Sequence, residues 1–219
     1  MAEFRLGNAA IVVLAESNNP RLLNPDFLER NKIVPDKWNP TNVLTTPPYA
    51  TVQYQEGLTI AVEENKLQFA ADPNRLAKWR DLLPDIAIHY LEVLPHVAYK
   101  AVGLNFTLLG DDPNGEAAEK ILIVNMLKQG EWLGFAGGIT GVNLELQFRQ
   151  TQSHFSLKIG VRETVRGQEK ALEGYVIVAN YHHDFTSDQA DKRAAYIRQL
   201  PTRHDELEAF VKQLPLSAN

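Results

Sequence analysis

The sequence predicts an α+β protein with a mostly antiparallel meander sheet and helices packed on one of its faces. Seven stretches alternate apolar and polar residues with a period of two, and the clearest places Val142, Leu144, Leu146 and Phe148 on one side. Such a strand has one buried and one solvated face. Short turns between several of these stretches force neighbouring strands to pair antiparallel. The buried face then needs a covering layer of helices.

The first expected elements are a strand at 4–14 and a short helix after it. Asn24 has the side chain of an N-cap, and Pro25 occupies the first helical position, where its missing N–H is not needed. Pro35 ends this helix. Residues 39–48 contain three of the twelve prolines, and we interpret them as an extended connector.

A meander over 50–69 is expected next, with turns at 56–57 and 64–65. Asp72-Pro73-Asn74 then starts a longer helix, in which apolar residues recur every three or four positions up to Pro95. Pro84 falls inside this pattern and should kink or divide the helix, because it lacks a backbone donor and crowds the preceding turn.

The second half repeats this general order. We expect a strand at 97–109, a turn at 111–115, a helix at 116–128 and a glycine-rich loop at 130–141. Three long strands follow at 142–149, 153–164 and 172–183, with a turn at 166–168 between the last two. Residues 186–188 cap a final helical region, which Pro201 splits.

The 219 residues suit one large domain or two small ones. We predict a single domain over 1–219, with possible pseudo-symmetric halves at 1–96 and 97–219, since each half reads as strands followed by helix.

Composition excludes several classes of site and partner. The net charge of -5 disfavours non-specific nucleic-acid binding, which needs clustered Lys and Arg. The absence of cysteine excludes disulfides, thiolate metal sites and Cys nucleophiles. Residues 9–15 are apolar, but this run is at the lower limit of a signal h-region and follows Glu3 and Arg5, so a buried strand is the favoured interpretation. No stretch approaches the roughly 18 to 20 apolar residues of a membrane span. We expect a cytoplasmic protein without a membrane partner.

The order of elements resembles that of a sporadically distributed bacterial protein family to which no activity is assigned. The likeness lies in a meander ending in 58–69, a helix with Trp79 and a late Tyr90, a strand with a Gly-Leu pair in 101–106, and a last helix with 206–210. The Arg-Tyr-Ile-Asn type of ending expected after that pair is absent. The resemblance implies the fold and no activity.

Two His-Asp pairs are the main candidates for chemistry. His182, His183 and Asp184 end the last strand, and His204 and Asp205 lie in the final helical region. Imidazoles and carboxylates suit a divalent metal, so His183, Asp184 and His204 are the candidate ligands. Adjacent strand residues face opposite sides, so the two strand histidines share a pocket only if the strand bends. The alternative is two solvated histidines at a strand end, with Asp184 helping to cap the next helix.

A second candidate is the glycine-rich segment 135–141, whose backbone donors could cradle a phosphate. The segment leads into a strand, whereas phosphate loops lead into a helix, and no Gly-Lys-Ser/Thr follows. A flexible linker or bulge is the favoured interpretation.

A third candidate is a basic surface made by Arg149, Lys158, Arg162 and Arg166, with His154 and Lys170 nearby. RNA-binding sheets place aromatic residues among such charges, and the wet faces here are mostly Asn, Gln, Ser, Glu and Thr. A solvated sheet face is therefore favoured over a nucleic-acid interface.

Nucleophilic catalysis has little support, because the chain has no Gly-x-Ser-x-Gly elbow. Trp38, Trp79 and Trp132 are interpreted as packing anchors.

Three functions follow as hypotheses. The first is a non-catalytic binding or scaffold protein without a cofactor, which binds a protein partner or a second copy of itself. The second is a metal-dependent hydrolase of the phosphoesterase or nuclease type, which would use the His/Asp cluster. The third is an RNA-associated subunit of a defence-type complex.

Overall fold

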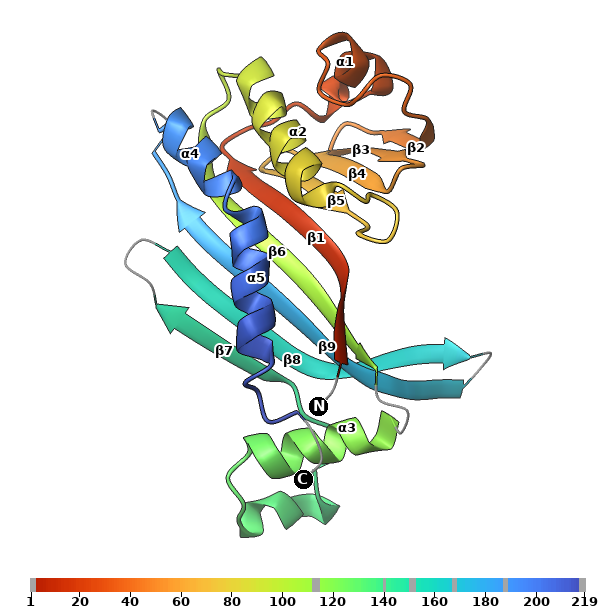
Figure 1. Ribbon diagram of the computed structural model, residues 1–219, viewed down its shortest axis with the longest axis vertical. Coiled ribbons are helices and arrows are strands. Elements are labelled where there is room, and N and C mark those ends of the chain that lie inside the picture. The colour runs from red at the N-terminus through yellow and green to blue at the C-terminus, as the bar shows by residue number, and fades with distance from the viewer. Residues whose placement is uncertain are drawn as a thin grey trace.

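Two long strands, β1 (Glu3–Ala15) and β6 (Tyr99–Asp111), pair with each other inside the sheet (Figure 1). The computed structural model describes residues 3–111, 115–139, 141–149, 153–166, 169–186 and 189–216, with the backbone alone at 115–117, 163–166 and 169–173. Alternate residues of β1, including Ile11 and Val13, are fully buried, as the period-two pattern predicts.

Shorter strands extend the sheet on both sides of this central pair. The side of β1 carries β5 (Lys66–Ala71), β4 (Leu58–Glu63), β3 (Tyr49–Tyr54) and β2 (Pro40–Thr45). The side of β6 carries β9 (Glu169–Asp184), β8 (Ser153–Arg166) and β7 (Leu144–Arg149). The order is β2-β3-β4-β5-β1-β6-β9-β8-β7, and all pairs are antiparallel. The sheet is open, with β2 and β7 as its edges.

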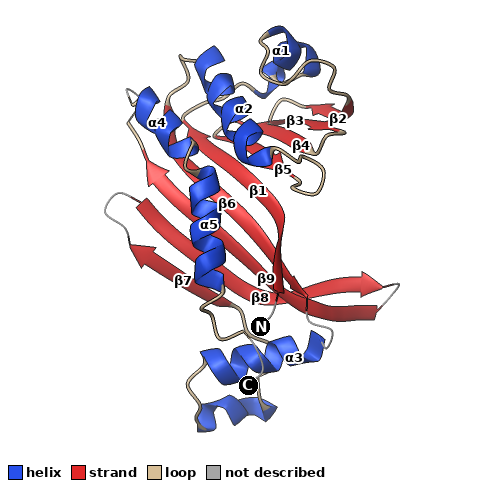
Figure 2. Cartoon of the chain, viewed as in Figure 1, coloured by secondary structure: helices blue, strands red, loops and turns tan. Residues whose placement is uncertain are grey.

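Helices cover one face of this sheet (Figure 2). Three of them lie over the central strands: α2 (Trp79–Val93), α4 (Ala190–Ile197) and α5 (Leu200–Val211). A short helix η1 (Pro20–Leu22) lies near β3 and precedes α1 (Pro25–Arg30). At the other end, α3 (Gly115–Ile121) continues into a π-helix η2 (Leu122–Met126) and a 3-10 helix η3 (Glu131–Gly137). The predicted α+β class is confirmed.

The N-cap predicted for α1 is present in the structure, whereas Pro84 does not divide α2. The Asn24 side chain accepts a hydrogen bond from the backbone N–H of Phe27 at 2.8 Å, and Pro25 occupies the first turn of α1. Pro84 lies buried inside α2, which continues through it from Trp79 to Val93. The helix is therefore not divided, because packing against the sheet offsets the single lost backbone hydrogen bond.

Two sequence predictions are wrong in part. Residues 40–45 form the edge strand β2 and not a connector, because Thr46 and Tyr49 close a hairpin through backbone hydrogen bonds of 2.8 and 3.3 Å. Pro40 is tolerated as the first residue of an edge strand. The expected loop at 130–141 contains the helix η3. The expected turns at 111–115, 166–168 and 186–188 include residues outside the described ones.

The core runs as a continuous apolar layer under the helices. Register places Ile60, Phe69, Ile11, Leu104 and Tyr181 side by side on successive strands, and each is at most 4 % exposed. Both halves of the chain contribute to this one layer. A bilayer crossing needs a long, apolar helix, and no helix in the described part of the chain meets both requirements.

The opposite face of the sheet carries small and polar side chains. Register aligns Ala10, Asn105, Asn180, Ser156 and Gln147 across five strands. The Asn180 amide donates a hydrogen bond to the side-chain oxygen of Asn105. This polar row matches the wet half of the alternating pattern.

Candidate functional site

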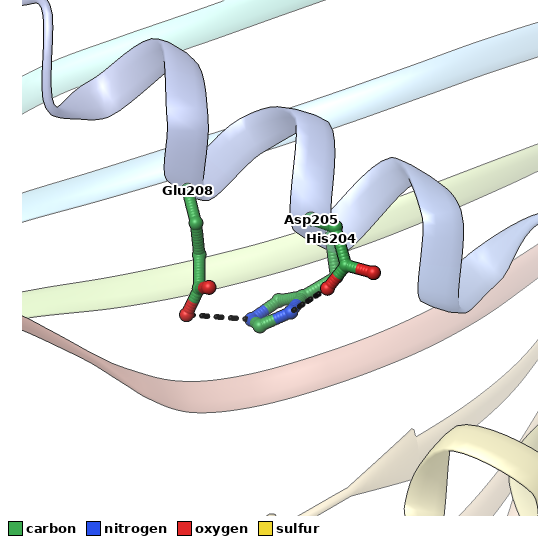
Figure 3. Close-up of side chains that lie close together, drawn as sticks. All are labelled: His204, Asp205 and Glu208. Carbon is green, nitrogen blue, oxygen red and sulfur yellow. Dashed lines mark ion pairs between the residues drawn. The ribbon is translucent and has the colours of Figure 1, made fainter.

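His204 and its neighbours form the densest group of titratable side chains (Figure 3). His204 and Glu208 lie one turn apart on α5, so both project from the same side of the helix. The imidazole is 5 % exposed and lies edge-on to the Trp79 ring, at a centroid distance of 5.3 Å. It also contacts Phe106 of β6 at 5.6 Å. His204 is thus held between a helix of the first half and a strand of the second.

Arg80 of α2 places a positive charge beside this group and donates hydrogen bonds to it. Its guanidinium donates to both carboxylate oxygens of Asp205 at 2.7 Å, to the Pro201 carbonyl at 3.2 Å, and to His204 Nδ1 at 3.4 Å. The hydrogen bond from Arg80 holds the pKa of Asp205 below its usual value. Burial lowers the pKa of His204, with Arg80 adding to this effect while Glu208 and Asp205 oppose it.

These contacts assign the tautomer of His204. Because a guanidinium can only donate, Nδ1 must accept, and the neutral ring carries its hydrogen on Nε2. Nε2 has no hydrogen-bond partner among the described residues, and the nearest Glu208 oxygen is 3.7 Å away. The ring is therefore a neutral, buried group that joins α2 to α5, and it is closed to a substrate.

A metal ion does not fit this group as it stands. Asp205 lies beside Nδ1 at 3.7 Å, whereas Glu208 lies beside Nε2, so the two carboxylates flank opposite sides of the ring (Figure 3). Each ring nitrogen therefore faces a different carboxylate, although one ligand atom from each of the three side chains lies within 4.8 Å of the others. Both oxygens of Asp205 are also engaged by Arg80.

The strand histidines lie elsewhere and face opposite sides of the sheet. His182 is on the polar face, where its Nε2 lies 3.0 Å from an Asp184 oxygen. His183 is under α4, with its ring 4.4 Å from Phe185 and 4.9 Å from Tyr196, and burial lowers its pKa. The pairing of β9 with β6 continues without a register shift to Asp184.

The predicted ligands are therefore not brought together. Among the described residues, His204, Asp205 and Glu208 are the only group of three potential metal-ligating side chains with ligand atoms within 4.8 Å of one another. His183 and Asp184 do not join it. Glu208 and Arg80 belong to the cluster and were missed from sequence, although the i,i+4 spacing of His204 and Glu208 signals one of these contacts.

The basic residues are spread along the sheet. Arg149 pairs in register with His154, and Lys158 lies four residues further along β8, about 13 Å away at 3.3 Å per residue. Lys158 is 3.5 Å from Glu145, and Arg162 is 3.0 Å from Asp111. These carboxylates offset the positive potential.

Parts of two other sequence candidates lie outside the described atoms. The side chains of Arg166 and Lys170 are not described. Residue 140 of the glycine-rich segment is also outside the described residues, while Gly137 and Gly138 adopt φ of 94° and 105°, which favour glycine.

A groove of about 720 Å³ separates residues 30–36 from α2. Two polar contacts lie on its walls: Arg198 lies 2.9 Å from an Asp85 oxygen, and His89 Nε2 lies 2.8 Å from the Asn31 carbonyl oxygen. Arg30, Lys32, Asp36 and Glu92 also line the groove.

The two edges of the sheet differ in charge. Every residue of β2 is exposed, including Val43 at 46 % and Leu44 at 47 %, and no charged residue occurs from Trp38 to Gln55. By contrast, β7 carries Glu145 and Arg149. Charged side chains are a common protection of edge strands against further pairing, and β2 lacks them.

One of the three tryptophans is not a packing anchor. Trp79 is 7 % exposed in the core, and Trp38 packs against Tyr54 at a ring distance of 5.7 Å. Trp132 is 54 % exposed on η3, and Phe135 near it is 83 % exposed. The prediction is wrong for Trp132, because the short helix that carries it projects from the body and has no core to enter.

Comparison with family models, with curated proteins and with solved structures gives no match to this chain. The resemblance in the order of elements remains a prediction.

Proposed function

We propose that this protein is a non-catalytic binding or scaffold module that associates with a second copy of itself through β2. The observation that supports this proposal most directly is the uncharged edge strand Pro40–Thr45, in which every residue is exposed. An edge strand presents unpaired backbone N–H and C=O groups, which another strand can satisfy.

The sequence of β2 is compatible with pairing to its own copy. In an antiparallel pair centred on Val43, that residue faces its symmetry mate, Asn42 faces Leu44, and Thr41 faces Thr45. Such β-branched and Thr-Thr pairs are favourable across strands, and no like charges meet. A two-fold contact of this kind extends the sheet through both copies.

The state of His204 agrees with a role without catalysis. His204 is buried and contacts Arg80, which joins α2 to α5, whereas Asp205 and Glu208 beside it are exposed.

Charge swapping at Val43 tests the proposal. We expect a dimer by light scattering at low micromolar concentration, and monomers for Val43→Lys and for Val43→Glu, because each places like charges opposite each other. An equimolar mixture of the two variants should dimerise again. Gln147→Lys, which adds the same charge to the β7 edge, serves as the control and should remain dimeric. A wild-type protein that is monomeric under these conditions would contradict the proposal.

A further inference from the structure

His182 has a histidine neighbour that is far from it in the sequence. Register places His154 of β8 directly opposite His182 of β9, so the two side chains lie on the same face of the sheet. This is the polar face, on the side away from the helices (Figure 2). The antiparallel pairing of β8 with β9 therefore brings two imidazoles together on an open surface.

The spacing of this pair suits a transition-metal ion. Residues directly opposite each other on antiparallel strands have Cβ atoms about 4.5 to 5.5 Å apart. Zn–N bonds of about 2.0 to 2.1 Å place two imidazole nitrogens on one ion roughly 3 to 4 Å from each other. Two rings can reach one ion from this register without movement of the backbone. His154 is exposed, so its ring is free to change rotamer and meet the ion.

Asp184 prepares the His182 ring as a ligand. One of its carboxylate oxygens lies 3.0 Å from Nε2 of His182. An ionised carboxylate can only accept, so Nε2 carries the hydrogen and the neutral ring presents its lone pair at Nδ1. Metal-binding histidines commonly donate their second N–H to a carboxylate, which orients the ring and raises the basicity of the ligand nitrogen. Asp184 is this supporting group and not itself a ligand.

The surroundings of the pair leave room for an ion and its water ligands. Beyond His182, the residue in register on β6 is Gly103, which has no side chain. Beyond His154, towards β7, a hollow of about 540 Å³ is lined by His154, Ser156 and Gln147 among other residues. An ion held by the two imidazoles therefore stays accessible to water or to an oxygen-donor ligand.

The charges around the pair offset one another. Arg149 of β7 is in register with His154, and its positive charge opposes a cation. The negative charge of Asp184 lies at the His182 side of the pair. Lys158 and Glu145, the next charged residues along β8 and β7, lie 3.5 Å apart and offset each other. Binding therefore depends on the imidazoles and not on a strongly acidic surface.

We propose that His154 and His182 bind one divalent transition-metal ion on the polar face, with Asp184 as the supporting carboxylate. Imidazole is a preferred ligand of Zn²⁺, Cu²⁺ and Ni²⁺. The chain has no cysteine that would compete for the ion. With two protein ligands, the site is weaker than a structural zinc centre, which has four. The site does not depend on β2 or on self-association.

Calorimetric titration of Zn²⁺ into the chelator-treated full chain tests the site. The wild type should bind one ion per chain, and His154→Ala and His182→Ala should each abolish measurable binding. Asp184→Asn keeps the shape of the side chain and removes its charge, and should weaken binding about 10-fold. Arg149→Gln should strengthen binding, because it removes the positive charge that opposes the ion.

Three further variants separate this site from other sources of affinity. His96→Ala removes an exposed histidine elsewhere and should bind Zn²⁺ as the wild type does. Glu208→Gln tests the His204 group and should also leave binding unchanged. His154→Cys should restore the binding that His154→Ala loses, because a thiolate is also a Zn²⁺ ligand.

The melting temperature gives a second readout. Zn²⁺ should raise it for the wild type and not for His154→Ala, since an ion that binds only the folded chain stabilises it. No Zn²⁺ binding by the wild type, binding that survives His154→Ala, or binding that requires Glu208 would overturn the proposal. None of these results bears on the β2 contact, which the Val43 charge swap judges separately.

Discussion

At the scale of single residues, burial and one hydrogen bond decide the state of His204. The ring is 5 % exposed, and its Nδ1 accepts from Arg80. Both effects favour the neutral form, so His204 acts in this structure as a polar packing residue. A histidine next to an aspartate in the sequence looks like a catalytic pair, and only the position of Arg80 shows that it is not an open site.

Acid should therefore destabilise the protein through His204. Its pKa in the folded state is lowered from 6.5, so the unfolded state binds the proton more readily. The free energy of unfolding should be constant above the unfolded pKa and fall as the pH drops from 6.5 through the folded pKa. For this one group the slope reaches at most about 1.4 kcal/mol per pH unit.

Urea unfolding at a series of pH values checks this. His204→Gln should show a shallower pH dependence than the wild type, and the remaining slope includes His183, whose pKa burial also lowers. His96→Gln, at an exposed position, should keep the wild-type slope. An unchanged slope in His204→Gln would contradict the assignment.

At the scale of elements, turns fix which strands become neighbours. Gly57 joins β3 to β4 with φ of 96°, and its backbone bonds to the Tyr54 carbonyl and the Asp72 N–H. The sequence predicted this turn correctly. The sequence did not predict β2, because prolines lie on both sides of its only apolar residues, Val43 and Leu44. The strand is defined by its pairing with β3 and not by a pattern in its own sequence.

Gly57→Ala should destabilise the protein by about 1 to 3 kcal/mol, since a left-handed conformation is unfavourable for alanine. A Cβ at this position would also lie 2.7 Å from the Arg75 Cβ. Gly134→Ala is the matched control, because a Cβ there would meet nothing within 4 Å, and its effect should stay within about 0.5 kcal/mol. If denaturant melts showed the same loss of unfolding free energy for Gly57→Ala and Gly134→Ala, this explanation would be wrong.

At the scale of the whole molecule, the β1–β6 pair joins the two halves. Its register runs from Glu3 opposite Asp111 to Ala15 opposite Tyr99, so the longest strand of the first half has its partner in the second. A contact between helices also joins the two halves, since Arg80 of α2 binds Asp205 of α5. Outward from the β1–β6 pair, the strand order is β5-β4-β3-β2 on the side of β1 and β9-β8-β7 on the side of β6.

We expect one cooperative unfolding transition for residues 1–219. Far-ultraviolet circular dichroism and tryptophan fluorescence should give coincident denaturant curves, because neither half has a complete core alone. Leu104→Ala, at a fully buried position of β6, should cost about 2 to 5 kcal/mol and shift both curves together. Two separate transitions, or a shift in one probe alone, would show instead that 1–96 and 97–219 are independent domains.

The sequence by itself determined the fold class, most strand positions, the Asn24 cap and the Gly57 turn. These depend on alternation and on local backbone preferences, which act between residues close along the chain. It did not determine which titratable groups meet. Arg80 reaches His204 and Asp205 across more than a hundred residues, whereas His183 contacts Tyr196 of α4 and is not part of the His204 group.

Exposure was likewise decided only by the tertiary structure. Trp79 and Trp132 each have charged and apolar neighbours in the sequence, yet one is buried under α5 and the other projects on η3. The same holds for Val43 of β2, whose apolar side chain matches a core pattern but lies at an edge that no helix covers. Burial depends on what packs against a residue from elsewhere in the chain, and a local pattern carries no information about that contact.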